Sequence, residues 1–475
     1  ASAKSRQRIR QAQNQHPDAL VVVFGCLPIL HAGQLSIPAK NTHLIPDRNG
    51  LAATLSRLVC GPATQPEHTP ASRSLRSVPN TPIKAKNGFK IKNKNKLCHN
   101  DLELSPLTSF KGQTRAFLKI QDGCDGACTY CIVPKTRPFV RSKPVEEVLL
   151  EAQALVEAGH KEIVLTGVFL GAYGQQSARR RNWPGQRNDH LADLLEKMAK
   201  FPNLSRIRLS SLEPGDVTDR LLDTLCANCN IMPHLHLSLQ SGSDAILRKM
   251  CRQYGIDEFR RKIESIKSRL DRPAITTDLI VGFPGETNAD FEQTVNLARE
   301  VGFAKIHVFS YSPRPGTAAA RSNNKVDKKV VRERSEILRE VGIELGRQFR
   351  RQFLGETAEI LIEETTVRSM GVPPMSSTGV SPVKAGPSPS RAESREWPCY
   401  NALTGTLQTV SRLSSIVACG RSERYFKVYV SVARDSGLVS GRAEPAPSGV
   451  EGRNDLVRVK LSEVHENGMI GTYDL

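Results

Sequence analysis

The stretch from Gln121 to Pro134, which reads QDGCDGACTYCIVP, constrains this 475-residue chain more than any other. It places Cys124, Cys128 and Cys131 within eight residues, in the spacing C-x3-C-x2-C. A strand-like apolar run, Ala116–Ile120, comes directly before it. Thiolate sulfur is the ligand that iron–sulfur clusters take, and three neighbouring thiolates bind three irons of a cubane. The fourth iron then stays open to a substrate, as in catalytic metal sites with a free position.

Two other interpretations of these cysteines stay open at this point. One is a zinc site with a distant fourth ligand from Cys226 or Cys229, although paired C-x2-C units are more typical of zinc. The other is a chance cluster of inert, buried thiols. Gly123 and Gly126, beside the cysteines, indicate a tight loop, because glycine accepts backbone conformations closed to other residues. The spacing favours the open-iron cluster over both alternatives.

The charge of the chain indicates a polyanionic partner. The formal net charge is +19, with +13 over residues 1–120, +7 over 121–352 and −1 over 353–475. A solvated basic linker and a phosphate-binding surface both account for this distribution. Eleven cysteines in a large chain without a secretory signal or a bilayer-length apolar run predict a cytoplasmic protein with no membrane association.

The first 110 residues predict a small α/β segment followed by a linker. Ala19–Gly25 is a continuous apolar run, typical of a buried parallel strand, and Cys26 follows at its carboxyl end. Ligand sites of open α/β sheets gather there, but a single cysteine is more often a small buried residue. Residues 61–110 are rich in Pro, Ser, Asn and Lys, and Ile83–Lys96 holds six lysines and no acid. This composition predicts a basic disordered linker.

From residue 111 on, strand-like and helix-like segments alternate. The expected strands are 116–120, 162–166, 205–210, 234–239, 276–281 and 304–311, and the expected helices are 144–158, 191–200, 217–226, 257–270 and 290–301. Six such βα units predict an α/β fold with a parallel, barrel-type sheet. The loops at the strand carboxyl ends would then carry the chemistry, as in the complete eight-unit barrel.

The last third of the chain predicts a long charged helix and a small all-β domain. The helix is expected over 327–353, and alternating segments follow at 357–363, 425–432 and 456–463, with Gly471 in a final short strand. A Pro-, Ser- and Gly-rich insertion at 368–398 interrupts them. We expect a small antiparallel β-barrel.

Several polar residues and glycines recur where the expected strands of the parallel sheet end. They are Thr166, Gly167, Ser211, Glu213, Gln240 and Gly282. A glycine turn at one strand end has a purely structural explanation, but recurrence at successive ends indicates a ligand site.

These motifs resemble those of a known family. C-x3-C-x2-C with Tyr130 just before the third cysteine resembles the signature of radical S-adenosylmethionine (SAM) enzymes. The surrounding motifs are RSKP (141–144), LTGVFLGAYG (165–174), LSSLEP (209–214), HLHLSLQSGSD (234–244) and TTDLIVGFPGET (276–287). Together they resemble the radical SAM methylthiotransferases, and within these the branch that acts on threonylcarbamoyladenosine (t6A) in tRNA. The resemblance runs from about Thr114 to Arg321.

The resemblance implies a cofactor site and a reaction. Cys124, Cys128 and Cys131 would hold a [4Fe-4S] cluster whose open iron binds SAM. Reductive cleavage of SAM would give a radical that removes hydrogen from C2 of t6A, and a methylated sulfur would join that carbon, giving 2-methylthio-t6A next to the anticodon. The residues expected to contact SAM are Tyr130, Thr166, Gly167, Ser211, Glu213, Gln240 and Gly282.

The resemblance also implies the domains and partners. Residues 1–60 would be part of a flavodoxin-like domain that binds an auxiliary [4Fe-4S] cluster, with Cys26 as its third ligand. The first two ligands lie upstream in the family, so we expect an N-terminally truncated chain, and we take Cys60 and Cys98 as inert. Residues 111–352 would form a partial (β/α)6 radical SAM barrel, and 353–475 a TRAM-like β-barrel that binds tRNA. Gly420–Tyr425 matches the family only loosely.

We expect tRNA as the substrate, an electron donor such as flavodoxin or ferredoxin, and a monomer. Three alternatives remain: a methylthiotransferase acting on isopentenyladenosine in tRNA, one acting on a ribosomal-protein aspartate, and a non-catalytic, zinc-stabilised RNA-binding protein.

Overall fold

The computed structural model describes residues 20–24, 42–45, 113–183, 189–365, 399–400, 407–408, 416–432, 454–465 and 467–473, and a few isolated positions before residue 16. The chain divides into two compact units, Ala1–Ser105 and Pro106–Leu475. In the first unit, β1 (Val21–Phe24) pairs in parallel with β2 (Thr42–Ile45), which confirms the strand expected over Ala19–Gly25. Cys26, Cys60, Cys98, the linker at 61–110 and the insertion at 368–398 lie outside the described residues.

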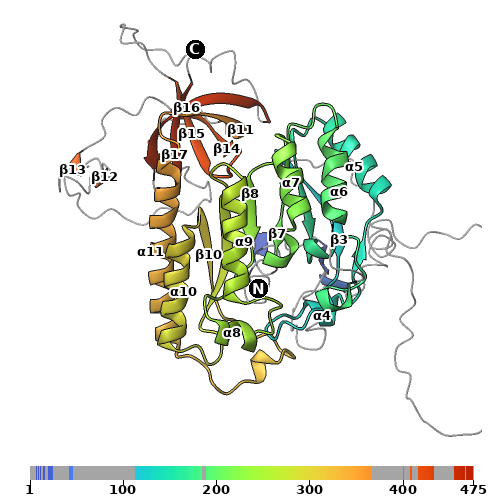
Figure 1. The fold of residues 1–475 in the computed structure, drawn as a ribbon, viewed down its shortest axis with the longest axis vertical. Coiled ribbons are helices and arrows are strands. Elements are labelled where there is room, and N and C mark those ends of the chain that lie inside the picture. The colour runs from blue at the N-terminus through green and yellow to red at the C-terminus, as the bar shows by residue number, and fades with distance from the viewer. Residues whose placement is uncertain are drawn as a thin grey trace, which may run out of the picture. The chain divides into compact units, whose positions relative to one another are not determined.

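The second unit opens with alternating strands and helices, drawn from cyan to yellow in Figure 1. They are β3 (Arg115–Asp122), α4 (Val133–Thr136), β4 (Arg141–Ser142), α5 (Val145–Glu157), β5 (Glu162–Gly167), α6 (His190–Ala199), β6 (Arg206–Leu209), β7 (Ser211–Leu212), α7 (Asp219–Ala227), β8 (His234–Leu237), α8 (Asp244–Lys249), α9 (Ile256–Arg269), β9 (Ala274–Val281), α10 (Asn288–Val301) and β10 (Lys305–Ser310). Each strand and helix expected between residues 116 and 311 is present, with its ends shifted by a few residues.

The strands form an open, parallel half-barrel. They are hydrogen-bonded in the orders β4-β3-β5-β6 and β7-β8-β9-β10, and β7 continues the chain from β6 after a single residue, Ser210. A parallel bridge between Ile207 and Ile231 also joins the two sheets. Every pair is parallel except β3 with β4, at the edge. The expected fold class is therefore confirmed.

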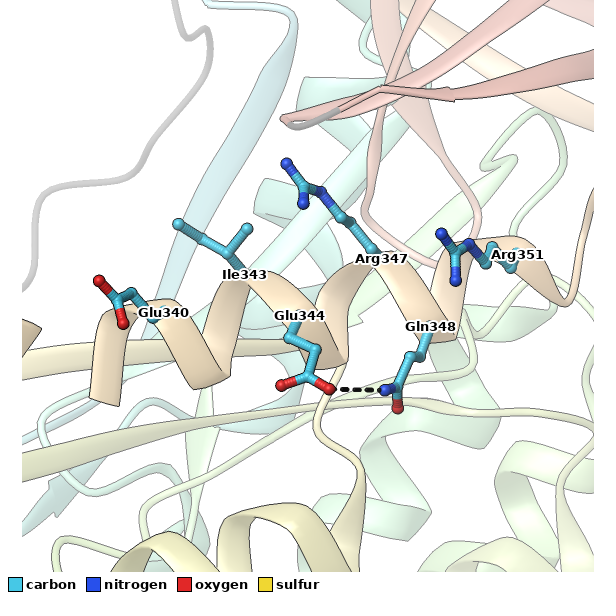
Figure 2. A pocket seen from close by; sticks show the side chains of 6 residues that line it. All are labelled: Glu340, Ile343, Glu344, Arg347, Gln348 and Arg351. Atoms are coloured by element: carbon cyan, nitrogen blue, oxygen red, sulfur yellow. Dashed lines mark hydrogen bonds between the residues drawn. The ribbon is translucent and has the colours of Figure 1, made fainter. Parts of the chain in front are cut away.

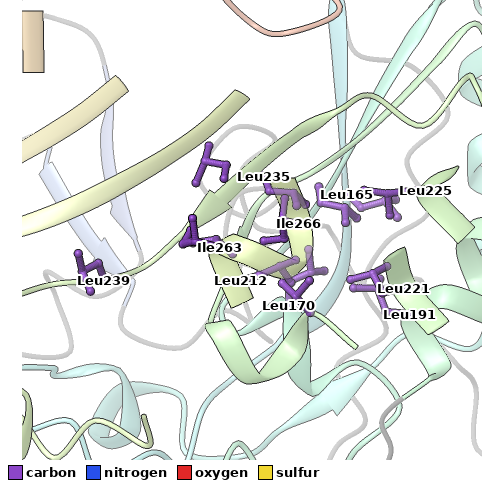
Figure 3. Packing of buried hydrophobic residues seen from close by; sticks show 14 of the residues in the cluster. Leu165, Leu170, Leu191, Leu212, Leu221, Leu225, Leu235, Leu239, Ile263 and Ile266 are labelled. Atoms are coloured by element: carbon purple, nitrogen blue, oxygen red, sulfur yellow. The ribbon is translucent and has the colours of Figure 1, made fainter. Parts of the chain in front are cut away.

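The core lies between this sheet and the helices that cover its outer face. On α9, for example, Ile256, Phe259, Ile263 and Ile266 recur at helical spacing and are buried. Figure 3 shows how leucines and isoleucines from strands and helices meet in this cluster. Each fully buried side chain of this size contributes about 1.5–3 kcal/mol, so the cluster keeps the strand ends in fixed positions.

A long helix, α11 (Lys328–Arg351), follows the half-barrel, as expected. It buries Leu338, Val341 and Leu345 in the same core. Its outer side forms a surface groove whose lining carries both signs of charge, and in which Gln348 donates a hydrogen bond to Glu344 at 3.1 Å (Figure 2). None of the helices in the described part of the chain is both long and apolar enough to cross a membrane.

The C-terminal strands close into a small barrel. These are β11 (Thr357–Thr365), β14 (Ile416–Ser422), β15 (Lys427–Val432), β16 (Leu456–His465) and β17 (Gly468–Tyr473), in the order β11-β14-β15-β17-β16. The separate strands β12 (Cys399–Tyr400) and β13 (Leu407–Gln408) pair with each other. The small β-barrel is confirmed, with one correction: β15 and β17 run parallel, so the barrel is not wholly antiparallel. The sequence analysis also missed β14.

Two buried arginines on β6 join this barrel to the half-barrel. Arg208 pairs with Glu162 at 2.8 Å and donates to the carbonyl oxygens of Ser422 at 2.7 Å and Glu423 at 2.9 Å. Arg206 donates to the carbonyl oxygens of Glu359 at 2.6 Å and Arg421 at 3.0 Å. Because the contacts lie at the amino ends of the strands, the carboxyl ends stay available for chemistry.

Tyr425 completes this interface in a left-handed backbone conformation, with φ of +69°. Its hydroxyl accepts a hydrogen bond from Arg115 at 3.1 Å, and its ring lies 4.5 Å from the ring of His234. Three guanidinium groups, those of Arg115, Arg208 and Arg421, lie within 5.2 Å of the ring centroid. Cations favour the face of an aromatic ring, which explains how so many arginines gather here.

We expect Arg208→Met to destabilise the protein strongly. The substitution leaves the buried Glu162 carboxylate without its closest partner and removes two hydrogen bonds to the C-terminal barrel. Loss of one member of a buried pair costs about 3–5 kcal/mol, measured as the free energy of unfolding in urea. Arg220→Met, which removes an ion pair with Glu196 at the surface, is the control and should leave the free energy of unfolding nearly unchanged. Equal losses for the two variants would contradict this account.

Candidate functional site

The cysteine loop follows the carboxyl end of β3 and is held by backbone hydrogen bonds. Cys124 N donates to Arg137 O at 2.9 Å, and Thr129 N donates to Met250 O at 3.1 Å, at the end of α8. Gly123 has φ of +77°, and a Cβ there would lie 1.7 Å from Phe139 O. No residue with a side chain fits at that position, which agrees with the tight loop expected from the sequence.

The three thiols of this loop are partly buried and lie close enough to influence one another. Burial raises the pKa of Cys124 to about 11, and the neighbouring thiols Cys128 and Cys131 add to this effect. Burial also raises the pKa of Cys131 above its usual value. Such thiols hold their protons at neutral pH until a metal displaces them, because a metal binds the thiolate.

The donor set of the loop fits an iron–sulfur cluster. Three soft sulfur donors lie on one loop, and each thiolate of a cubane binds a different iron. Within the described residues, no group of three or more His, Cys, Asp or Glu side chains is arranged around a single metal ion. Gly126 N already donates a hydrogen bond to Cys124 Sγ at 3.3 Å, the kind of contact that stabilises a ligating sulfur.

The structure does not bring the C-x2-C pair to this loop. Cys226 and Cys229 are exposed near the carboxyl end of α7, where Cys226 Sγ donates to Arg269 O at 3.4 Å. The carboxyl end of α7 leads to the amino end of β8, whereas the cysteine loop follows the carboxyl end of β3. In a parallel half-barrel these are opposite ends.

Arg252 connects the cysteine loop to Glu213, and the sequence analysis missed it. Its guanidinium donates to Cys128 Sγ at 3.2 Å and to the Tyr130 hydroxyl at 3.3 Å, and it pairs with Glu213 at 2.5 Å. Although burial opposes the charged form, Tyr254 and Glu213 hold the pKa of Arg252 well above its usual value. The cation is therefore permanent at the edge of the cluster site. Burial also raises the pKa of Tyr130, so its hydroxyl stays neutral.

Thr166 and Gly167 end β5, beside the cysteine loop. Thr166 Oγ1 donates to Leu118 O at 3.3 Å. A Cβ on Gly167 would lie 3.0 Å from the Gln121 side chain, so the space beside this glycine belongs to Gln121. Gln121 accepts from Phe169 N at 2.8 Å and donates to Gly123 O at 2.8 Å, which ties the end of β5 to the cysteine loop. Gln121 is thus a second positioning residue that the sequence analysis missed.

Gln240 follows the carboxyl end of β8, and Ser211 follows the carboxyl end of β6, where β7 begins. Gln240 is buried with φ of +69°; its N donates to Asp278 O and its O accepts from Ile280 N, both at 2.9 Å. Ser211 is exposed, at the start of β7. Both lie toward the carboxyl end of the sheet, and among the described contacts neither touches the cysteine loop.

Gly282 begins the turn after β9 with φ of +76°. Its N donates to Glu286 at 2.8 Å, and a Cβ there would lie 2.3 Å from Val331 of α11. Glu286 pairs with the buried Arg334 at 2.7 Å. Helix α11 therefore fixes this turn, and close packing is a sufficient reason for the glycine.

Comparison with known proteins agrees with this geometry. The Radical SAM superfamily matches residues 118–298. The chain is 35% identical over 364 residues to the threonylcarbamoyladenosine tRNA methylthiotransferase MtaB of Bacillus subtilis, covering 76% of this chain and 73% of that protein. It is 41% identical over 256 residues to the protein of the same name from Thermotoga maritima, covering 54% and 57%. It is 40% identical over 249 residues to the tRNA-2-methylthio-N(6)-dimethylallyladenosine synthase of Bartonella bacilliformis, covering 52% and 53%.

The matched region runs from within β3 to within α10, and so contains most of the half-barrel, the cysteine loop and the strand ends described above. The chain spans about half the length of the Thermotoga and Bartonella proteins and nearly three quarters of the Bacillus protein. The identity to the Bacillus protein extends well beyond the cysteine loop. The chain belongs to the radical SAM methylthiotransferase family.

Proposed function

We propose that this protein is a tRNA-modifying radical SAM enzyme that converts t6A to 2-methylthio-t6A next to the anticodon. The observation that carries the proposal is the trio Cys124, Cys128 and Cys131 on a glycine-shaped loop at the carboxyl end of a parallel half-barrel. Relatives named as t6A methylthiotransferases, at 35–41% identity, support the choice of substrate.

The three cysteines would hold a [4Fe-4S] cluster, and Tyr130, Thr166, Gly167, Ser211, Glu213, Gln240 and Gly282 would surround SAM. Bound together, cluster and SAM supply a radical strong enough to take hydrogen from an unactivated C–H bond. The chain's own residues would position the cluster and SAM and polarise the ligands that hold them. Arg252 donates to the Cys128 sulfur, and Glu213 presents a buried carboxylate that accepts hydrogen bonds from cationic groups.

The remaining parts of the proposal concern the rest of the chain. Cys26 would be one ligand of a second, auxiliary [4Fe-4S] cluster in an N-terminal domain that includes residues 1–60. Residues 111–352 would form the radical SAM domain, and 353–475 a TRAM-like barrel that contacts tRNA. An anticodon loop suits such an enzyme, because its bases are unpaired and splay out. We further propose a cytoplasmic monomer reduced by flavodoxin or ferredoxin.

The relatives favour t6A over the alternatives. An isopentenyladenosine substrate corresponds to the dimethylallyladenosine synthase, which the chain also resembles over 249 residues, but the alignment with the Bacillus t6A enzyme covers more of the chain. The described contacts do not support a zinc site that includes Cys226 or Cys229.

We expect Cys124→Ala, Cys128→Ala or Cys131→Ala to abolish cluster binding and reductive SAM cleavage, because a cubane needs all three thiolates of the loop. The measurement is iron and acid-labile sulfide per chain after anaerobic reconstitution, followed by 5′-deoxyadenosine formation. Cys229→Ala is the matched control and should retain both, since Cys229 is exposed and follows the carboxyl end of α7, at the opposite end of the half-barrel from the loop. One zinc per chain in place of iron and sulfide would overturn the proposal in favour of a zinc-stabilised protein.

We expect the chain to raise methylthio-t6A in tRNA when it is expressed in a strain that lacks its own t6A methylthiotransferase. Mass spectrometry of nucleosides from total tRNA measures the product, with the triple cysteine-to-alanine variant as the control. Methylthiolated isopentenyladenosine, or a modified ribosomal-protein aspartate, would assign the enzyme to another branch of the family. SAM cleavage with no sulfur transfer would show that the auxiliary part is incomplete in this chain.

A further inference from the structure

The segment Gln175–Trp183, after β5, packs directly on the cysteine loop. The carboxylate of Asp125, between the first two cysteines, accepts hydrogen bonds from Ala178 N at 2.5 Å and Ser177 Oγ at 2.7 Å. Arg179 Nε donates to Asp125 O at 2.9 Å. Arg179 opens a run of three arginines at 179–181, and the first two of them, Arg179 and Arg180, make contacts inside the protein.

Arg180 is the centre of this segment. Its guanidinium carbon lies 5.9 Å from the centroids of the Phe169 and Trp183 rings. One terminal nitrogen lies 2.8 Å from Glu213 and 2.8 Å from Asp216. Burial opposes the charge on Arg180, but these two carboxylates keep its pKa above the usual value. The next residue in the run, Arg181, is exposed.

Arg180 and the two carboxylates fit together only because two neighbouring residues, Gly171 and Gly215, have no side chain. A Cβ on Gly215 would lie 2.8 Å from Arg180 Nε, and a Cβ on Gly171 would lie 2.0 Å from the Asp216 carboxyl carbon. Asp216 itself accepts from Glu213 N at 2.7 Å. Asp216 and Glu213 are therefore joined by a contact that does not involve Arg180. Arg180 pairs with both carboxylates from the side of the segment Gln175–Trp183.

Glu213 then passes this restraint to the cysteine loop. One carboxylate oxygen pairs with Arg180, and the other pairs with Arg252, which donates to Cys128 Sγ. A buried carboxylate paired with two guanidinium groups loses its freedom to rotate, because turning it moves an oxygen away from an opposite charge. A continuous buried chain of contacts therefore runs from Arg180 through Glu213 and Arg252 to the second cysteine.

We propose that Arg180 is a positioning residue that fixes Glu213, and through it Arg252, against the cysteine loop. Two sets of contacts join the segment Gln175–Trp183 to the cysteine loop: the chain of contacts from Arg180 to Cys128, and the hydrogen bonds to Asp125. We call this segment the brace, because it holds the loop in its ordered conformation before any cofactor binds. What the ordered loop serves rests on the proposed function, namely the binding of the cluster and of SAM.

Hydrogen exchange of the protein without cofactors tests the brace directly. Arg180→Gln keeps a hydrogen-bonding side chain but removes the charge, so Glu213 and Arg252 are released and amides over 123–131 and 250–254 should exchange faster. Arg180→Lys should restore part of the protection. Arg181→Gln, the adjacent exposed arginine, should leave the exchange unchanged. Wild-type protection of both segments in Arg180→Gln would overturn the proposal.

A second variant displaces Arg180 without changing any charge. Gly215→Ala places a methyl group 2.8 Å from Arg180 Nε and should raise exchange in the same two segments. If a variant unfolds as a whole, exchange rises everywhere and its far-ultraviolet circular dichroism is lost. Increased exchange confined to these segments in Gly215→Ala supports the brace, and an unchanged pattern in a folded Gly215→Ala contradicts it.

SAM affinity of the reconstituted protein separates the brace from the proposed function. Arg180→Gln should weaken SAM binding about tenfold, read from the SAM-dependent change in the electron paramagnetic resonance of the reduced cluster, with Arg181→Gln unchanged. A wild-type protein that binds no SAM would refute the proposed function and leave the exchange result standing. Faster exchange with unchanged SAM affinity would show that the brace does not act on the SAM site, and would overturn that part of the proposal.

Discussion

The direction of the parallel strands determines where everything else in the second unit lies. Parallel strands have all of their carboxyl ends at one edge of the sheet and all of their amino ends at the other. At the carboxyl edge lie the cysteine loop, Glu213, Gln240 and the turn at Gly282. At the amino edge lies Arg208, with its contacts to the C-terminal barrel. One topological rule thus separates the reactive end of the unit from its structural end.

Both ends are built from buried arginines, but the arginines have different partners. At the carboxyl edge, Arg180 and Arg252 share the carboxylate of Glu213, and the charges compensate within the site. At the amino edge, Arg206 and Arg208 face Glu162 and a series of carbonyl oxygens. Buried ions are tolerated only when opposite charges or polar groups lie close to them, so both clusters need accurate placement of several strands at once. Each cluster therefore depends on the same apolar core.

Local signals in the sequence were enough for the main features of the fold. The strands and helices between residues 116 and 311 follow from hydrophobic periodicity, and the cysteine spacing identifies its loop directly. Glu213 was found because it ends a strand. These features share one property: the information lies within a few consecutive residues.

Contacts between distant residues could not be predicted in this way. Arg252 lies 124 positions from Cys128, and nothing in its neighbourhood distinguishes it from a solvated arginine. Arg180 sits in a run of three arginines whose members have opposite environments, which composition cannot separate. Likewise β14 and the parallel pairing of β15 with β17 depend on closure of the barrel, since short strands of mixed polarity carry little periodic signal. The sequence predicts the candidate cluster ligands, but not the residues that hold their loop in place.

The interface between the half-barrel and the C-terminal barrel has an evolutionary consequence. Arg206 and Arg208 grip the far side mainly through main-chain oxygens, those of Glu359, Arg421, Ser422 and Glu423. A carbonyl oxygen is offered by every amino acid, so these four hydrogen bonds do not depend on which side chain the accepting residue carries, as long as the backbone keeps its course. The interface therefore depends on the side chains of Arg206 and Arg208, but only on the backbone of the residues whose carbonyl oxygens they contact. Within the same turn Tyr425 is the exception, because its ring and hydroxyl contact Arg115 directly.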